Sequence, residues 1–391
     1  MTKVLFLVGN QIEKGTFWRA SYFAKELSKL DYEVTYLAIS RSSKRGFVQR
    51  EYKGFTLVET PAFLPFAYDP WNTINRMKWL NGRTFDLIHT FESRPVVIFP
   101  ALYLKKQLGI PLIMDWCDWF GRGGSVEERS NPLTRGIMRP IETFFEETFR
   151  TRADGTTVIN HVLRQKAIDL GVPAESILYL PNGANTIDFQ PKELRQVREK
   201  LRLPLDVPIL AYPGVIFKRD AMLMAAAFEH IHQVCPSARL LLIGYVNIEV
   251  EQFMPTAVEA VIRTGPISDF NKVVDYIAAS NIGWLPLRNS GANQGRFPLK
   301  AFDFMAAGRP LVSTDVADLG QMVREKRIGL VAPDDPVELA QTALKLINDY
   351  PLQEEMGRRG RQIVETEFAG PIITTQLDKY YQYILHEWRK S

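Results

Sequence analysis

Cysteine is scarce in this 391-residue chain, which has only Cys117 and Cys235. Two cysteines exclude a disulfide framework and a multi-cysteine zinc site, and they are typical of a reducing compartment. Long apolar runs are also missing, because the longest, 95–104, is far shorter than the roughly 20 residues of a membrane-spanning helix. The first residues, Met1–Gly9, are too few for a signal peptide and resemble a buried strand. We therefore expect a cytoplasmic protein.

No charge of one sign dominates, since 48 Lys and Arg stand against 44 Asp and Glu, a formal net charge of +4. A nucleic-acid-binding protein is usually more basic and more clustered, so we expect no nucleic acid partner. One local cluster is basic and interleaved with aromatic residues: Arg41, Lys44, Arg45, Arg50 and Lys53. We interpret it as a solvated loop and an edge hairpin. The alternative is a patch that contacts an anionic membrane surface.

Short β-branched runs alternate with longer amphipathic stretches along the whole chain, which predicts parallel α/β sheets. A chain of this length exceeds one ordinary core, so we expect two doubly wound domains, at 1–190 and 191–370. Prolines near 191–208 mark the boundary. The predicted strands are 3–8, 33–39, 56–60, 86–90, 111–115, 155–159, 177–180, 208–212, 239–243, 260–263, 282–286, 310–313 and 329–332. Two such domains predict an interdomain cleft at the carboxyl ends of the strands.

Two strand-to-helix turns carry candidate anion sites. The first, 9–16, contains Gly15 and Thr16, and bare backbone amides at such a turn can approach a phosphate. It matches neither the dinucleotide fingerprint nor the P-loop, so a simple tight turn is the alternative. The second, 212–220, has Gly214 before Lys218 and Arg219. A basic pair at a helix N-terminus opposes the helix dipole, which favours an anion site over a solvated helix end.

The most specific stretch is 295–313, where proline and glycine positions predict a helix that begins near Pro298 and ends before Gly308. Lys300 and Asp303 share one face of this helix. A carboxylate one turn into a helix can accept hydrogen bonds from the diol of a ribose. The alternative is an aspartate that only stabilises the helix N-terminus.

Residues 298–312, Pro-Leu-Lys-Ala-Phe-Asp-Phe-Met-Ala-Ala-Gly-Arg-Pro-Leu-Val, resemble the donor-site helix of the retaining glycosyltransferases of family 4, which have the two-domain GT-B fold. The segment Pro181-Asn182-Gly183-Ala184-Asn185 resembles the hinge motif of that family. Gly15-Thr16 resembles the N-terminal glycine-rich loop of the family, and residues 154–160 resemble the segment before its cleft. Gly244 and Gly265-Pro266 resemble the turns that lie beside the nucleotide base. The likeness extends over nearly the whole chain.

The resemblance implies a role for each of these positions. Asp303 would bind the donor ribose, and Lys218 with the backbone of Leu299 and Lys300 would hold the diphosphate. Gly15 and Thr16 would close over the phosphates, and the terminal helix, 371–391, would cross back onto the first domain. The remaining implied donor-binding residues are Gly214, Arg219, Gly244, Pro266 and Phe297.

Three departures from the family pattern are visible. Val215 stands where a diphosphate-binding arginine is common, Gly295 where a sugar-contacting carboxylate is common, and Cys117 where a histidine often precedes an aspartate. We expect Asp118 to contact the acceptor or the transferred sugar, with Asp115 as the second candidate. A thiol without a basic neighbour is mostly protonated, so we do not expect Cys117 to be a nucleophile.

Other chemistries find little support. The five histidines show no metal-ligand spacing, and the resemblance implies no metal and no other cofactor, because the nucleotide sugar is a substrate. No nucleophile elbow indicates a hydrolase. His89, at a predicted strand end, is interpreted as a hydrogen-bonded structural residue.

We therefore expect a retaining glycosyltransferase that moves a hexose-type sugar from UDP or GDP to a hydroxyl of a glycan or lipid-linked acceptor, in glycolipid or cell-envelope polysaccharide synthesis. The aromatic segment 63–71 could meet lipid or sugar rings, or it could cap the core of the first domain. We expect a cytoplasmic location, at the inner face of the cell membrane if the acceptor is lipid-linked. The alternatives are a non-catalytic nucleotide-sugar-binding or partner subunit, favoured by the three departures, and a nucleotide-sugar epimerase on the same fold.

Overall fold

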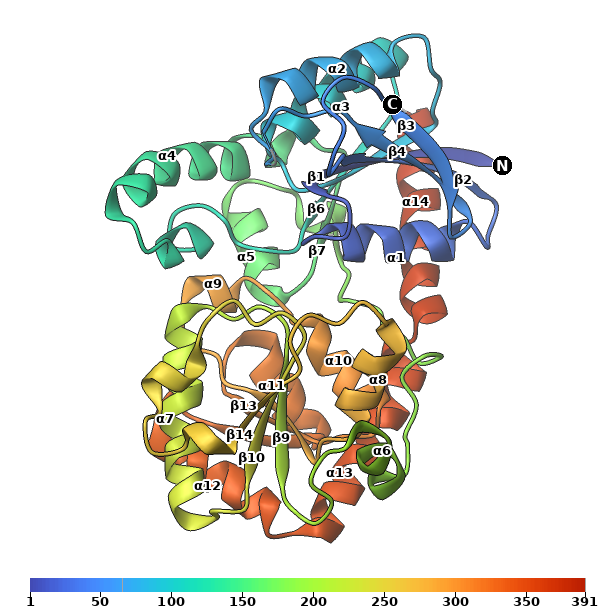
Figure 1. Cartoon of the computed structure of the whole chain (residues 1–391). Coiled ribbons are helices and arrows are strands. Elements are labelled where there is room, and N and C mark those ends of the chain that lie inside the picture. The colour runs from blue at the N-terminus through green and yellow to red at the C-terminus, as the bar shows by residue number, and fades with distance from the viewer. Residues whose placement is uncertain (65, 391) are drawn as a thin grey trace. The chain divides into compact units, whose positions relative to one another are not determined.

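The computed structural model describes residues 1–64 and 66–390 and divides the chain into two compact units (Figure 1). Unit 1 comprises 1–181 together with the C-terminal segment from Pro371, and unit 2 comprises Asn182–Gly370. The division therefore lies at 181/182, within the predicted hinge motif, rather than at 190/191. The terminal helix belongs to unit 1 although it follows unit 2 in the sequence.

Within the described part of unit 1, eight strands form one sheet in the order β3-β4-β2-β1-β5-β6-β7-β8. All neighbours pair in parallel except β3 and β4, which form an antiparallel hairpin at the sheet edge. The strands are β1 Thr2–Gln11, β2 Tyr32–Ile39, β3 Val48–Tyr52, β4 Phe55–Thr60, β5 Leu87–Phe91, β6 Leu112–Trp116, β7 Gly155–Val158 and β8 Ile177–Tyr179.

Helices cover both faces of this sheet. The α-helices are α1 Phe17–Leu27, α2 Pro70–Leu80, α3 Pro95–Leu108, α4 Pro132–Thr148, α5 His161–Asp169 and α14 Gly370–Lys390. The short 3₁₀ helices are Ser125–Glu128, Arg150–Arg152 and Ala174–Ser176. On one face, Leu5 and Leu7 of β1 pack in the core with Val97 and Ala101 of α3. On the other, the ring of Phe6 contacts His89, whose ring contacts Tyr381 of α14. Alternation along a buried strand therefore assigns each side chain to one of two helical layers.

The basic cluster of 41–53 lies in the loop before β3 and in the β3–β4 hairpin. Arg41 pairs with Glu13 at 2.8 Å, and Arg50 pairs with Glu59 at 3.1 Å. Two of the five cations of this cluster are therefore paired with carboxylates of unit 1. The hairpin interpretation of this segment is confirmed, whereas the membrane interpretation stays a prediction.

Within unit 2, six strands form an all-parallel sheet in the order β11-β10-β9-β12-β13-β14. They are β9 Ile209–Pro213, β10 Arg239–Ile243, β11 Val261–Arg263, β12 Ile282–Leu285, β13 Leu311–Thr314 and β14 Gly329–Ala332. The α-helices are α6 Leu194–Leu201, α7 Lys218–Val234, α8 Phe270–Ala278, α9 Gly291–Gln294, α10 Leu299–Ala306, α11 Ala317–Lys326, α12 Pro336–Ile347 and α13 Tyr350–Ile363. Short turns of 3₁₀ helix lie at Val250–Phe253 and Val258–Ala260, and a π-helix at Val364–Phe368.

The fold prediction of two doubly wound, parallel-sheet units is confirmed. Every predicted strand is present, with ends that differ by only a few residues. That the two face a cleft stays a prediction. Among the described residues, no helix is both long enough and apolar enough to span a bilayer.

Candidate active site

The carboxyl edge of the unit 2 sheet collects most of the predicted donor residues. Gly214 follows β9, Gly244 follows β10 and Pro266 lies shortly after β11, while the segment after β12 leads through α9 into α10. These strands are parallel, so their carboxyl ends lie at one edge, which is where open α/β sheets bind ligands.

The loop between β9 and α7 is held by hydrogen bonds that its backbone amides donate. The Gly214 amide donates to the Ile243 carbonyl at 2.8 Å, and the Ile216 amide donates to Asn247 Oδ1 at 2.9 Å. Gly214 has a φ of 78°, a conformation that glycine adopts readily. Helix α7 then starts at Lys218, with Lys218 and Arg219 exposed on its first turn. The result is a helix N-terminus with two exposed cationic residues, which suits an anion.

Lys300 of α10 reaches the same loop. Its ammonium lies 3.6 Å from the centre of the Tyr212 ring and donates to the Val215 carbonyl at 3.4 Å. Burial, with the nearby positive charge of Arg296, lowers the pKa of Lys300 well below its usual range. A bound anion would relieve this cost. The position that lacks the family arginine, Val215, thus has an ammonium beside it.

Asp303 lies almost one turn further along α10 than Lys300 and is only partly accessible to solvent. Burial raises the pKa of its carboxyl to about 7, and the charge of Lys300 opposes that shift. A carboxyl with a pKa of about 7 ionises near neutral pH. The ionised form is the stronger hydrogen-bond acceptor, and a diol needs such an acceptor in order to bind.

Asp220 organises the loop that leads into α10. Its Oδ1 accepts hydrogen bonds from the Arg288 amide and from Asn293 Nδ2, both at 2.8 Å. The guanidinium of Arg296 stacks 4.2 Å over the Phe217 ring and lies 3.7 Å from Asp220 Oδ2. Asp220 is not among the residues predicted from the sequence, although a carboxylate directly after two cationic residues at a helix start is a usable signal.

Phe297 and Leu299 differ in exposure. Phe297 is buried, with its ring 5.0 Å from that of Phe302, so its side chain supports the start of α10 from beneath. Leu299 is exposed. Neither observation tests contact with a donor, and both roles stay predictions.

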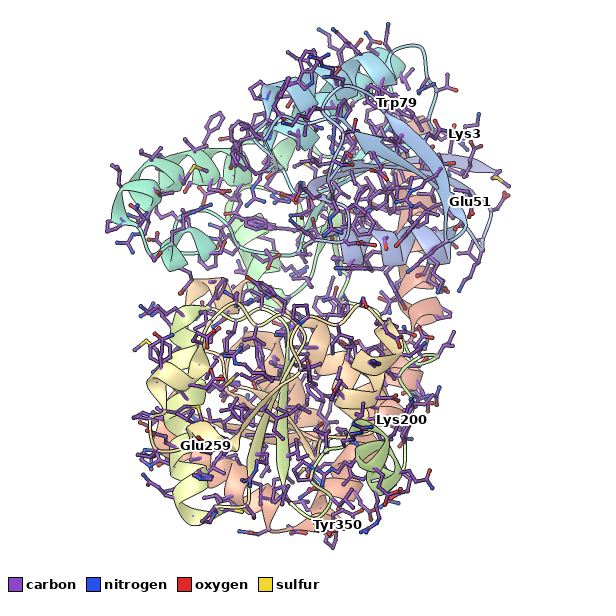
Figure 2. All side chains as sticks on the ribbon, viewed as in Figure 1. Lys3, Glu51, Trp79, Lys200, Glu259 and Tyr350 are labelled. Carbon is purple, nitrogen blue, oxygen red and sulfur yellow. The ribbon has the colours of Figure 1, made fainter. Side chains whose placement is uncertain are left out.

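A hollow of about 350 Å³ in unit 2 lies elsewhere. It is lined by residues that include Tyr350, labelled in Figure 2, together with Asn281 and Pro310, which immediately precede β12 and β13. It is therefore at the amino edge of the sheet and contains none of the predicted donor residues. In the described residues of both units, no group of three or more His, Cys, Asp or Glu side chains could hold a metal ion.

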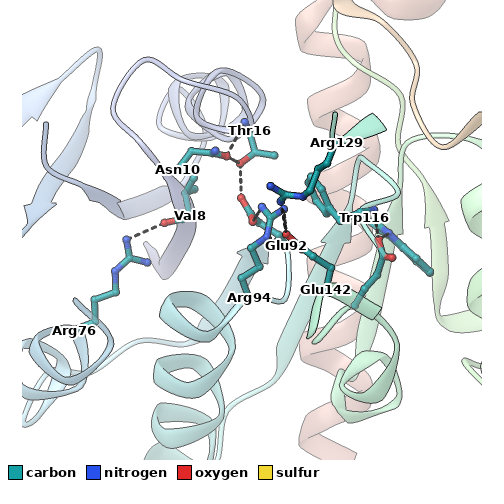
Figure 3. A network of polar contacts seen from close by, with 11 residues as sticks. Val8, Asn10, Thr16, Arg76, Glu92, Arg94, Trp116, Arg129 and Glu142 are labelled. Carbon is teal, nitrogen blue, oxygen red and sulfur yellow. Dashed lines mark hydrogen bonds and ion pairs between the residues drawn. The ribbon is translucent and has the colours of Figure 1, made fainter. Parts of the chain in front are cut away.

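In unit 1 the Gly15 loop is fixed by a chain of polar contacts (Figure 3). Thr16 is hydrogen-bonded through its amide to Asn10 Oδ1 at 3.0 Å and through its hydroxyl to Glu92 Oε1 at 3.0 Å. Gly15 has a φ of 53°, and a Cβ there would lie 2.9 Å from the Asn10 amide, so the loop needs glycine. The loop is therefore held by Asn10 of its own segment and by Glu92 of a distant one.

Glu92, which sequence analysis missed, lies directly after β5. It is buried, has a φ of 89° that is unusual for glutamate, and pairs with Arg94 at 2.7 Å. Arg94 in turn pairs with Glu142 of α4 at 3.1 Å. The network thus connects the Gly15 loop to α4 (Figure 3). A carboxylate just beyond a buried strand was the signal that could have identified Glu92.

Asp115 is fully buried at the end of β6. Arg19 binds it through two hydrogen bonds of 2.9 Å, and the Thr157 hydroxyl donates to it at 2.5 Å. Arg19 holds the pKa of this carboxyl below its usual value against the effect of burial. His89, on the adjacent strand, is also buried, and burial lowers its pKa to about 3. Its Nδ1 lies 2.5 Å from the Tyr381 hydroxyl, as the structural interpretation expects. The catalytic role of Asp115 stays a prediction, but its hydrogen-bonding oxygens are engaged within unit 1.

Asp118 lies two residues beyond β6, at the carboxyl edge of the unit 1 sheet, and is partly accessible. Of the two predicted acceptor-side carboxylates it is the one that substrate could reach. Cys117 beside it is buried, and burial with the nearby carboxylates raises the pKa of its thiol well above the usual value.

Thiol titration tests this assignment. We expect a charged disulfide reagent to modify Cys235, which is partly accessible, and to leave Cys117 unmodified until the protein unfolds. A Cys235→Ser variant should then show no rapidly reacting thiol. Rapid modification of Cys117 in that variant would contradict the buried, protonated thiol.

The fold is shared with solved GT-B glycosyltransferases. The chain aligns with sucrose-phosphate synthase from Thermosynechococcus elongatus over 99% of this chain and 100% of that one, with a TM-score of 0.76 and 18% identity. It also aligns with Anabaena Alr3699/HepE, solved in complex with UDP, over 98% and 100% of the two chains, with a TM-score of 0.69 and 15% identity. Both likenesses define the class of fold.

The sequence relatives define the family. Residues 15–187 match the model "Glycosyltransferase Family 4", and residues 208–349 match "Glycosyl transferases group 1". The putative teichuronic acid biosynthesis glycosyltransferase TuaH of Bacillus subtilis is 36% identical over 272 residues, 68% of this chain. That match spans 64% of the relative, less than two thirds of its length. The chain belongs to the family 4-like glycosyltransferases.

Proposed function

We propose that this protein is a retaining glycosyltransferase that moves a hexose-type sugar from a nucleoside diphosphate, UDP or GDP, to an acceptor hydroxyl. The observation that carries the proposal is the carboxyl edge of unit 2. There α7 begins after the loop that follows β9, the ammonium of Lys300 contacts that loop, and the carboxyl of Asp303 lies within the field of this ammonium on the same helix. A helix N-terminus and a cation suit a diphosphate, and a carboxyl suits a ribose diol.

The chemistry required of these residues is mainly electrostatic. The anomeric carbon–oxygen bond to the diphosphate breaks, the acceptor oxygen forms the new bond on the same face, and the acceptor proton passes to the departing phosphate oxygen. Charge develops on the diphosphate, so Lys218, Lys300 and the α7 amides would lower the barrier by stabilising that charge. We propose that the chain does this without a divalent metal.

We propose that unit 1 serves the acceptor through Asp118 and binds the donor phosphates through the Gly15–Thr16 loop. Asp118 would contact the acceptor or the transferred sugar, because it is the accessible carboxylate at the carboxyl edge of that sheet. We propose that the acceptor is a glycan or a lipid-linked glycan of the cell envelope. The proposed location is the cytoplasm or the inner face of the cell membrane. The name of TuaH, a teichuronic acid biosynthesis protein, supports this choice.

A second candidate, a nucleotide-sugar-binding or partner subunit without activity, is favoured by Val215 and Gly295. Lys300 beside Val215 weighs against it, because the missing cation has a local substitute. Incubation with the nucleotide sugar alone distinguishes an epimerase on the same fold from a glycosyltransferase. Altered sugar without acceptor would indicate epimerisation, and donor binding with neither hydrolysis nor transfer would indicate a binding subunit.

The nucleotide base of the donor can be identified directly. A thermal-shift screen against UDP, GDP and ADP should raise Tm for one base far more than for the others, since a ligand that binds only the folded state stabilises it. No shift with any of the three would contradict a nucleotide site in unit 2.

The role of Asp303 predicts a pH dependence of nucleotide affinity. A ribose diol donates to the ionised carboxylate, so affinity for UDP or GDP should rise as pH increases through about 7 and fall below it. Asp303→Asn should weaken binding by about tenfold, the value of one charge-assisted hydrogen bond, and should lack this component of the pH profile. Calorimetry across this range measures both. The phosphate of the nucleotide titrates in the same way with the wild type and with the Asp303→Asn variant. Equal pH profiles of affinity for the two proteins would therefore contradict the ribose role.

A further inference from the structure

The hollow at the amino edge of the unit 2 sheet, here called the amino-edge hollow, has a mainly polar lining. Its walls come from the start of α6, from the residues just before β12 and β13, and from one face of α13. The polar lining residues are Asn281, Arg309, Tyr350, Gln353, Glu354 and Arg358. A volume of about 350 Å³ is at the lower end of the range for small-molecule sites. The hollow therefore suits a small polar ligand.

The guanidinium of Arg309, in the turn between α10 and β13, is only partly satisfied. Its Nη2 donates to the Lys192 carbonyl at 2.8 Å, whereas its Nε is buried and has no hydrogen-bond partner among the described residues. Burial lowers the pKa of Arg309 to about 10, although Tyr350 and Glu193 oppose that shift. Glu193 itself accepts hydrogen bonds from two backbone amides at the start of α6. A buried donor without a partner costs free energy, which a bound acceptor would recover.

Two glycines bring a second guanidinium to the same wall. Gly308 follows α10 with a φ of 69°, and the Arg309 amide donates to the Phe304 carbonyl at 2.9 Å, which fixes the turn. A Cβ at Gly357 of α13 would lie 2.1 Å from the Gly308 carbonyl oxygen, so the two segments meet backbone to backbone. Arg309 and Arg358 directly follow these glycines. The contact therefore places both arginines at the lining of one hollow.

Tyr350 and Glu354, on the first turn of α13, complete the polar lining. The Tyr350 side chain is 56% exposed, and its ring offers apolar surface beside the polar groups (Figure 2). Burial and a hydrogen bond with Glu354 raise the pKa of the Tyr350 hydroxyl, while Arg309 opposes this shift. The phenol, the carboxylate and the guanidinium are therefore close together. A carboxylate repels a bare anion but accepts hydrogen bonds from hydroxyl groups, so the lining favours an anion that also carries hydroxyls.

We propose that the amino-edge hollow binds the phosphate monoester of a small polyhydroxylated compound, which is the chemistry of a sugar phosphate. Arg309 and Arg358 would hold the phosphate oxygens, because guanidinium geometry matches a phosphate, and Glu354 would accept from the hydroxyls. A phosphate monoester carries a charge of about −1.5 to −2 at pH 7, which two guanidiniums balance. The site goes beyond the proposed sugar transfer, because it lies at the opposite edge of the sheet from the proposed donor site.

Calorimetry of the full chain with mannose 6-phosphate and ribose 5-phosphate tests the two arginines. We expect the wild type to bind at least one of these, and Arg358→Gln and Arg309→Lys to bind it at least about tenfold more weakly. A lysine keeps the charge of Arg309 but lacks the planar fork, and Tm without ligand shows whether that variant is folded. The matched control is Arg359→Gln, because Arg359 of the same helix pairs with Glu355 at 2.8 Å and does not line the hollow. That control should bind as the wild type does.

The ligand class is tested with inorganic phosphate, glucuronate and the free sugars, each of which lacks part of the proposed chemistry and should bind more weakly than the sugar phosphate. Equal or tighter binding of any of these would overturn the assignment. Failure of the wild type to bind either sugar phosphate, or wild-type affinity in Arg358→Gln, would overturn it too. Lys218→Ala should bind the sugar phosphate as the wild type does, and lost binding there would place the ligand in the donor site instead. Nucleotide affinity, measured separately on each variant, reports the proposed transfer function independently.

Discussion

Asp115→Asn is expected to destabilise unit 1 by about 3–5 kcal/mol, because it leaves the Arg19 guanidinium buried without its counter-ion. Denaturant unfolding followed by a probe in unit 1 measures the loss. Asp31→Asn provides the control, since Asp31 pairs with the N-terminus on the surface, and should change stability by no more than about 1 kcal/mol.

The pH dependence gives a second readout of the same pair. The folded-state pKa of Asp115 lies below its unfolded value, so its contribution to stability is complete above the unfolded pKa and is lost as pH falls through the folded one. The Asn variant should therefore lose less stability on acidification than the wild type. If Asp115→Asn keeps wild-type stability but loses turnover, the structural interpretation is wrong and the catalytic one stands.

Lys218→Ala is expected to lower kcat/KM by at least about tenfold, and Lys300→Ala by a similar factor. Each removes one cation from the proposed diphosphate site, and a charge-assisted contact is worth about 1.5–3 kcal/mol. Steady-state transfer from the nucleotide sugar that the thermal-shift screen identifies measures the effect. Lys300 lies against Tyr212, so its variant also needs a Tm measurement to separate lost packing from lost charge.

Lys272→Ala, at an exposed position of α8, is the control for charge removal in unit 2 and should leave kcat/KM unchanged. Unchanged kcat/KM in Lys218→Ala would remove that residue from the site. If Lys300→Ala alone were affected, the ammonium beside Val215 would be the principal diphosphate cation.

Much of the fold could be predicted because hydrophobic periodicity is local. All the strands except β3 could be located from short apolar runs such as 239–243, since a strand buried on both faces must be largely apolar. Strand β3, which the apolar pattern does not predict, is a polar edge strand with four of its five residues exposed. Edge strands carry no such apolar signal.

The candidate site was only partly predictable. Gly214, Lys218 and Asp303 follow from turn and helix signals that a few neighbouring residues carry. The ammonium of Lys300 beside Val215, 85 residues earlier in the chain, does not, because the loop after β9 and the start of α10 meet only through the order of strands in the sheet. The same holds for Arg19 and Asp115, which are 96 residues apart.

The amino-acid sequence by itself determined the two parallel-sheet units, the turns at their carboxyl edges and the family, since these depend on apolar period, glycine and proline placement and short motifs. Only the tertiary structure decided that Asp115 is a buried ion-pair partner, that Glu92 braces the Gly15 loop, and that Leu133 and Ile137 of α4 are exposed while Phe145 packs against the core. Burial and pairing are properties of residues brought together from distant parts of the chain. A helical period shows that α4 has two faces, but only its contacts show which of them meets the protein.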